Sequence, residues 1–263
     1  MSRDYSSISR FGLTEPFDLQ IARGQIAYHE SVYKFGNNAA VADSLETIWQ
    51  QGGLYSYLSA ATVLKVSSSS TNDASAGTGA RTVELFGLDG DYNEISETVT
   101  LNGQTAVNTT QSYLRINRMI VRSAGSGGAN AGVLYAGTGT VTTGVPANIY
   151  ATINGDGSNQ TLMAIWTVPA GYTAYLMQYD VSNGTTSNTP AVCKLSLVAR
   201  PYGEVFQTKD VKSLTTGMHI ENTLVIPIKF TEKTDIEARA ISSSNSVSFD
   251  ISAAFEIIYI KNT

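Results

Sequence analysis

Residues 246–260 read SVSFDISAAFEIIYI, and apolar and polar side chains alternate along most of this stretch. One set of alternate positions holds Val247, Phe249, Ile251, Ala253, Phe255, Ile257 and Tyr259, and the other holds Ser248, Asp250, Ser252 and Glu256. Because successive side chains of a β-strand point to opposite faces, this alternation predicts a strand with one buried face. A helix would instead need apolar residues three and four positions apart. The stretch therefore favours a β fold.

The rest of the chain continues this pattern in shorter runs, which are separated by turn-forming Gly, Asn, Ser and Pro residues. One series of runs starts at Ala27 and a second starts near Val145-Pro146, and neither contains a convincing amphipathic helix. We expect an all-β fold with two β-sandwich or jelly-roll-like modules, residues 27–145 and 146–263. An extended N-terminal arm, residues 1–26, precedes them.

The expected arm holds isolated apolar side chains among polar ones and has neither the strand nor the helix period. An extended segment of this length reaches about 85–95 Å, far enough to cross a neighbouring subunit. We therefore expect the arm to contact a neighbour, with a frayed tail as the alternative.

Two local features of the first module are predicted from its residues. Asn102-Gly103 is the pair best suited to the positive φ angles of a two-residue hairpin turn, so we expect a hairpin there. In the run YLRINRMIVRS the apolar phase changes, because Leu114 and Ile116 share one face while Met119 and Val121 share the other. A β-bulge near Asn117 would explain the change.

The composition describes a chain with ample core material and few surface charges. Of 263 residues, 42% are hydrophobic and 15% are charged, which is the reverse of the balance in a disordered protein. The net charge of -5 argues against a general nucleic-acid binder, which needs a basic face. We expect no membrane partner, because no apolar stretch has the length of a membrane span or signal peptide. The single cysteine, Cys193, is expected to be a buried apolar residue.

Motifs for catalysis and cofactor binding do not fit the sequence. In residues 123–144, SAGSGGANAGVLYAGTGTVTTG, the dinucleotide-binding pattern fails because Asn130 stands where its third glycine belongs. The sequence has no Gly-Lys pair for a nucleotide-triphosphate loop and no GxSxG elbow for a serine triad. The glycines are therefore interpreted as turns, both histidines as surface or interface residues, and we expect no cofactor.

One acidic segment is a weak candidate for a metal site. Asp89, Asp91 and Asn93 alternate as the oxygen ligands of a calcium loop do, but Glu94 and Thr100 stand where the loop needs glycine and a bidentate carboxylate. A turn decorated with acidic residues is the favoured alternative. Glu94 and Glu97 also raise a glycosidase couple as a minor alternative, although on a strand they point to opposite faces.

Four phrases of the sequence together resemble a family of virion structural proteins of tailed bacteriophages, particularly marine ones. These are KFGNNAAV (34–41), TIWQQGG (47–53), the run from VSSSSTNDASAGTGARTVELFGLDGDYNEISETVTL through RMIVRSAGSGGANAG (66–132), and NQTLMAIWTVPAGYTAYLMQY (159–179). The resemblance implies a particle component without catalytic residues. It leaves open whether that component sits on the head, at the head-to-tail region, on the tail or at a fibre attachment.

The resemblance and the composition together predict a non-enzymatic bacteriophage virion structural protein. We expect a decoration or cement protein, favoured as a homotrimer, that binds the capsid through its arm and first module and has other virion proteins as partners. The residues expected to contact the neighbour are Arg10, Phe11, Phe17, Arg23, Tyr28 and Lys34. A tail- or fibre-associated adaptor, or a receptor- or glycan-binding protein of the virion, is the alternative, and a depolymerase is a third.

Overall fold

The computed structural model describes residues 6–8, 14–185, 187 and 189–262. Strands make up almost all of the regular secondary structure of the described chain, which confirms the expected all-β fold. Within these residues one helix is present, α1 (Phe17–Ala22), and it lies inside the segment expected to be an extended arm. No helix in the described ranges has the length and apolar character needed to cross a membrane.

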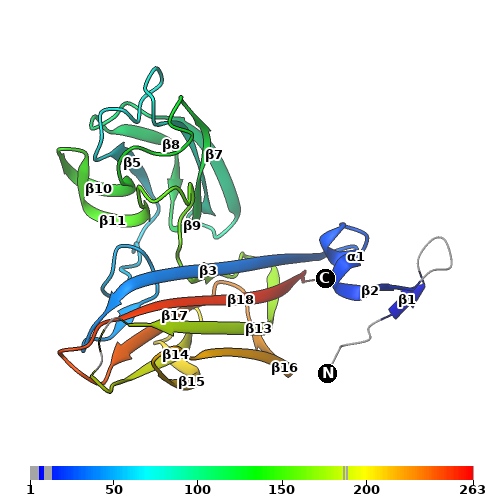
Figure 1. The fold of residues 1–263 in the computed structure, drawn as a ribbon. Helices are drawn as coiled ribbons and strands as arrows, with labels where there is room; N and C mark the ends of the chain where they lie inside the picture. The colour runs from blue at the N-terminus through cyan, green and yellow to red at the C-terminus, as the bar shows by residue number, and fades with distance from the viewer. Residues whose placement is uncertain (1–5, 9–13, 186, 188, 263) are drawn as a thin grey trace.

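The larger body, which we call the base sandwich, consists of two packed antiparallel sheets (Figure 1). The first sheet has the order β16 (His219–Phe230), β13 (Tyr172–Gly184), β18 (Phe249–Lys261) and β3 (His29–Val41). The second has the order β12 (Ile165–Thr167), β17 (Asp235–Ser242), β14 (Val192–Arg200) and β15 (Gln207–Thr215), with β4 (Glu46–Thr47) also paired to β17. The seven alternate apolar side chains predicted to share one strand face are all buried in the core between these sheets, and six of them lie on β18, with Val247 just before it.

The smaller body, which we call the inserted module, also contains two antiparallel sheets around a core of its own. One sheet has the order β11 (Val145–Ile153), β10 (Leu134–Thr142), β5 (Thr62–Ser68) and β8 (Val107–Tyr113). The other has the order β7 (Glu94–Thr100), β6 (Ala80–Leu88) and β9 (Arg115–Ala124). In Figure 1 this module stands above β3 of the base sandwich.

The two bodies are not consecutive in the sequence, because the smaller one is inserted into the larger one. β3 pairs with β18 and β4 pairs with β17, so strands from the N-terminal part complete the C-terminal sandwich. The chain leaves and re-enters the base side by side, at an antiparallel bridge between Trp49 and Met163. The boundary predicted between residues 145 and 146 falls within the β10–β11 hairpin instead of between modules. Turn-forming residues indicate that hairpin in the local sequence, whereas no local sequence pattern indicates that β3 pairs with the distant β18.

The two local predictions have different outcomes. The bulge is confirmed: Phe86 pairs with Arg118 and Gly87 pairs with Ile116, which leaves Asn117 as the extra residue of β9. The Asn102-Gly103 hairpin is wrong, although Gly103 does have a positive φ of 61°. β7 pairs with β6 whereas β8 pairs with β5, so this turn carries the chain from one sheet to the other.

The N-terminal segment projects from one end of the base sandwich (Figure 1). β1 (Ser6–Ile8) and β2 (Thr14–Pro16) form an antiparallel pair, and α1 follows β2 directly. α1 packs against β3 and buries Ile21. This contact attaches the projecting segment to the edge strand of the base.

Candidate functional site: the junction between the two modules

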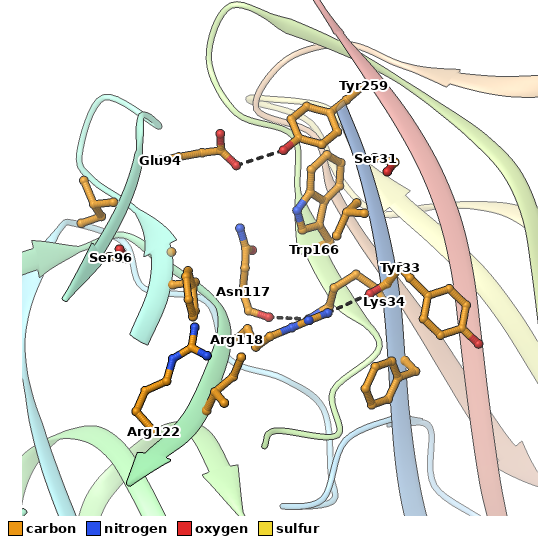
Figure 2. A pocket seen from close by; sticks show the side chains of 16 residues that line it. Ser31, Tyr33, Lys34, Glu94, Ser96, Asn117, Arg118, Arg122, Trp166 and Tyr259 are labelled. Carbon is orange, nitrogen blue, oxygen red and sulfur yellow. Dashed lines mark hydrogen bonds between the residues drawn. The ribbon is translucent and has the colours of Figure 1, made fainter. Parts of the chain in front are cut away.

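A cavity of about 630 Å³ lies where the inserted module meets β3 and β18 of the base (Figure 2). Side chains from both modules line it, so the cavity exists only in the assembled junction. Lys34, Arg118 and Arg122 lie on one side, and Glu94 and Tyr259 lie on the other. The alternation of side chains along β3 places Lys34 there, and the bulge in β9 places Arg118.

Lys34 is buried at the junction, with 2% of its surface exposed. Its Nζ donates a hydrogen bond to the main-chain oxygen of Asn117, the bulged residue of β9. Burial and, to a lesser extent, the charge of Arg118 hold the pKa of Lys34 well below its usual range. The expectation that Lys34 contacts a neighbouring virion protein does not fit this position, because the side chain lies inside the chain's own junction.

Arg118 lies beside Lys34 and bonds to the base sandwich. Its Nη2 donates to the main-chain oxygen of Tyr33 over 2.8 Å, and its guanidinium lies 5.7 Å from the ring centroid of Phe35. Burial lowers the pKa of Arg118. Arg122, by contrast, has a carboxylate partner, because its Nε lies 2.5 Å from Oε2 of Glu84. Among the described residues, neither Lys34 nor Arg118 takes part in an ion pair.

The opposite side of the cavity is acidic. The hydroxyl of Tyr259 donates to Oε2 of Glu30 over 2.9 Å and lies 3.4 Å from Oε1 of Glu94. Desolvation, followed by the nearby charge of Glu30, raises the pKa of Glu94. Glu97, the other member of the minor glycosidase alternative, instead accepts hydrogen bonds from Thr110 on β8. The structure therefore does not bring Glu94 and Glu97 together at one site.

A second cleft, of about 710 Å³, is also lined by both modules and contains a buried ion cluster. Asp235 is 2% exposed and accepts from Nε of Arg115 over 2.7 Å, from Nη2 of Arg200 over 2.5 Å and from Thr167 Oγ1 over 2.6 Å. Arg115 belongs to the inserted module, and the other three residues belong to the base. One carboxylate therefore joins the two modules.

Aromatic rings contact the basic side chains of this cleft. The Tyr57 ring lies between two guanidinium groups, 4.9 Å from that of Arg115 and 4.5 Å from that of Arg200. Lys233 Nζ lies 5.4 Å from the centroid of Tyr202, whose side chain is 67% exposed at the mouth of the cleft. Such cation–π contacts are strongest where water is excluded. Sequence reasoning missed this cluster, because its members lie far apart in the chain and share no motif.

The remaining residues predicted to contact a neighbour lie on or next to the projecting segment. The Phe17 ring packs edge-on against His29, with ring centroids 6.0 Å apart. Arg23 forms an ion pair with Glu15 at the surface, and Tyr28 is 65% exposed. The sequence predictions for Arg10 and Phe11 lie outside the described residues.

The acidic segment considered for a metal forms a turn. Oδ1 of Asp89 accepts from the main-chain N–H groups of Asp91 and Asn93, both over 2.9 Å. The side-chain amide of Asn93 donates to the same carboxylate. These bonds use the Asp89 carboxylate to close the loop, as in other Asx turns. Within the part of the chain that the structure describes, no group of three or more His, Cys, Asp or Glu residues is arranged to hold a metal ion.

Comparisons with known proteins give no family for the chain. No protein-family model matches it, and no curated protein matches it. Solved structures that match include the infectious bursal disease virus Gx strain (12% identity, TM-score 0.24, 89% of this chain and 71% of the other). They also include the VP2 subviral particle of that virus (10%, 0.19, 89% and 77%) and the Cry4Aa toxin from Bacillus thuringiensis (11%, 0.20, 91% and 59%). TM-scores this low carry no argument about fold or function.

Proposed function

We propose that the chain is a non-enzymatic structural protein of a bacteriophage virion, and that it decorates the capsid. Its N-terminal segment binds a neighbouring virion protein, and its two modules form a rigid body outside that contact. The resemblance of the quoted sequence phrases to virion structural proteins of tailed phages supports this proposal. The low-charge, Ser/Thr/Gly-rich composition also suits repetitive assembly.

The observation that carries the proposal is the projection of the N-terminal segment from the end of the base sandwich (Figure 1). β1, β2 and α1 together place Phe17 and Arg23 there, and the 65% exposed Tyr28 follows them. Aromatic and arginine side chains are the residue types that most often anchor protein interfaces. An arm of this kind, attached to one edge strand, is suited to hold a neighbouring subunit.

The junction supports a mechanical role for the rest of the molecule. Buried contacts from Asp235 to Arg115 and from Lys34 to Asn117 link the modules at two separate places. Breaking a buried ion pair leaves an uncompensated charge, so such contacts oppose separation of the modules. A stiff two-module body is what a particle component needs in order to present one fixed surface.

Deletion of the arm tests the proposal. A variant lacking residues 2–16 keeps α1, and therefore keeps Ile21 buried against the base. We expect the folded variant to be lost from purified particles, as judged by its amount relative to the major capsid protein. Tyr28→Ser is expected to weaken retention, whereas the control Tyr202→Ser, which alters an equally exposed tyrosine at the second cleft, is expected to have no effect. Full retention of both the deletion variant and Tyr28→Ser would remove the arm from the mechanism.

We propose contacts between copies at the edge strand β16, in keeping with a homotrimer. Val225 and Ile226 are 90% and 82% exposed, at a place where the pairing of β13 with β16 is interrupted. Exposed neighbouring apolar side chains mark interaction surfaces. Sedimentation analysis of the double variant Val225→Thr, Ile226→Thr is expected to show a smaller species than the unaltered protein. An unchanged mass would place the contact between copies elsewhere.

A tail-associated glycan-binding protein is the second candidate, and the second cleft favours it. Tyr202 offers an exposed aromatic ring, Lys233 lies next to it, and Arg200 lines the same cleft. Amphipathic rings of this kind are suited to sites that are partly apolar and partly wet. Copy number from quantitative mass spectrometry of virions separates the candidates: copies over the whole head support decoration, and a few copies at one vertex support the tail. Binding of host envelope polysaccharide that Tyr202→Ser abolishes would also favour the tail.

A further inference from the structure

We propose that the cavity at the module junction is a binding site for an oxyanion, the carboxylate or phosphate group of a small ligand, held between Lys34 and Arg118. This inference goes beyond the virion role, because it depends on the chemistry of the cavity alone. Figure 2 shows the two cationic side chains next to each other on one side of the cavity.

The positive charges of Lys34 and Arg118 have no negative partner among the described residues. Lys34 is 2% exposed, yet its only hydrogen-bond acceptor within the described residues is the main-chain oxygen of Asn117. A lysine ammonium has three donors, and a buried charge is normally matched by an opposite charge. Arg118 adds a second cation without an ion-pair partner among those residues. An oxyanion placed between the two would supply the missing negative charge.

The other charges at the junction do not fill this place. Arg122 lines the same cavity, but its guanidinium is paired with Glu84. Glu94 lies on the opposite side, next to the hydroxyl of Tyr259, and forms no ion pair with Lys34 or Arg118 in the described chain. In the second cleft, by comparison, the guanidinium groups of Arg115 and Arg200 both contact a carboxylate, that of Asp235. Lys34 and Arg118 differ from these groups in having no carboxylate partner among the described residues.

The cavity can also admit a ligand. Its volume of about 630 Å³ lies within the range of small-molecule sites. Trp166 forms part of the wall, and Figure 2 shows its indole nitrogen on the edge of the ring nearest Asn117. This edge presents a neutral N–H to the cavity. A ligand bound there would also report its presence through the fluorescence of Trp166.

The test is titration of the full-length protein at constant ionic strength with inorganic phosphate, acetate or glucuronate, followed by calorimetry and tryptophan fluorescence. We expect saturable binding of at least one of these probes, with one site per chain. Binding of phosphate alone would identify a phosphate ligand, and binding of acetate and glucuronate would identify a carboxylate ligand. Tighter binding of glucuronate than of acetate would indicate a ligand whose ring contacts the cavity wall. No saturable binding of any probe at millimolar concentration would overturn the proposal.

Variants locate the site. Lys34→Met removes the buried charge but keeps a long apolar side chain, and we expect at least a tenfold loss of affinity. Arg118→Gln is expected to give a similar loss, and it serves as an independent test if Lys34→Met fails to fold. The control Lys194→Met makes the same change of charge at an exposed position on β14 and is expected to bind like the unaltered protein. Equal affinity in Lys34→Met, Arg118→Gln and Lys194→Met would overturn the assignment.

Discussion

Among the residues that the structure describes, only the side chain of Asp235 accepts hydrogen bonds from guanidinium groups of both modules. Replacing it with asparagine keeps the shape but removes the negative charge, so Arg115 is left buried without a counterion. Loss of one partner of a buried ion pair costs about 3–5 kcal/mol. We expect Asp235→Asn to lower the free energy of unfolding by about this amount, measured by urea denaturation. The control Asp91→Asn, at an exposed turn position, is expected to change it by less than about 0.5 kcal/mol; equal effects would contradict the role of Asp235.

Glu94 makes the stability of the junction depend on pH in a defined direction. Its pKa in the folded protein is raised above the ordinary value of 4.5 by desolvation and by Glu30, so the folded state holds this proton more tightly than the unfolded state. The resulting stabilisation is complete below about pH 4.5 and is lost as the pH rises through the raised pKa. Glu94→Gln keeps a neutral side chain that can still accept from Tyr259.

We therefore expect the melting temperature of Glu94→Gln to equal that of the unaltered protein near pH 4 and to exceed it by about 1–2 °C near pH 7. Thermal unfolding across this pH range provides the measurement. Glu204→Gln, an exposed substitution at the second cleft, is the control and is expected to follow the unaltered protein. A lower melting temperature of Glu94→Gln at neutral pH would contradict the assignment.

At the scale of elements, β3 is constrained where it crosses the start and end of the insertion. A Cβ added at Gly36 would lie less than 3.0 Å from Ala164 N and Ile48 O, both backbone atoms. Backbone cannot move aside as a flexible side chain can, so Gly36→Ala is expected to destabilise the protein by about 1–3 kcal/mol. Gly184→Ala on β13, where an added Cβ meets nothing within 4 Å, is the control. Denaturation curves that coincide for the two variants would contradict this explanation.

The sequence allowed individual strands to be predicted but not their long-range pairing. The alternation in β18 and the phase change at Asn117 are local patterns, and both were interpreted correctly. The pairing of β3 with β18 joins segments from opposite ends of the chain, which no local pattern records. The burial of Lys34 at the candidate site could not be predicted for the same reason. Its side chain lies on the same face of β3 as that of Val32, but a lysine in a strand is normally interpreted as exposed. Its burial depends on β9 arriving from the other module.

At the scale of the whole molecule, the junction contacts predict that the two modules unfold together. The two cores are coupled by the Arg115–Asp235 and Lys34–Asn117 contacts and by the continuous chain at Trp49 and Met163. We expect one calorimetric transition for the unaltered protein and two for Asp235→Asn, because the weakened junction lets each core melt by itself. Asp91→Asn is expected to keep one transition. Two transitions in the unaltered protein would show that the cores are independent.

The insertion also determines the order in which the molecule can be completed during translation. The inserted module is encoded as one continuous stretch, so all its strands have emerged from the ribosome while the base still lacks β12 to β18. β3 must wait, with its pairing edge unoccupied, for β18, which follows every other described strand of the base in the sequence. Domains generally fold as units during synthesis. A nascent chain that stalls before residue 249 should therefore carry a finished inserted module above an open and aggregation-prone base.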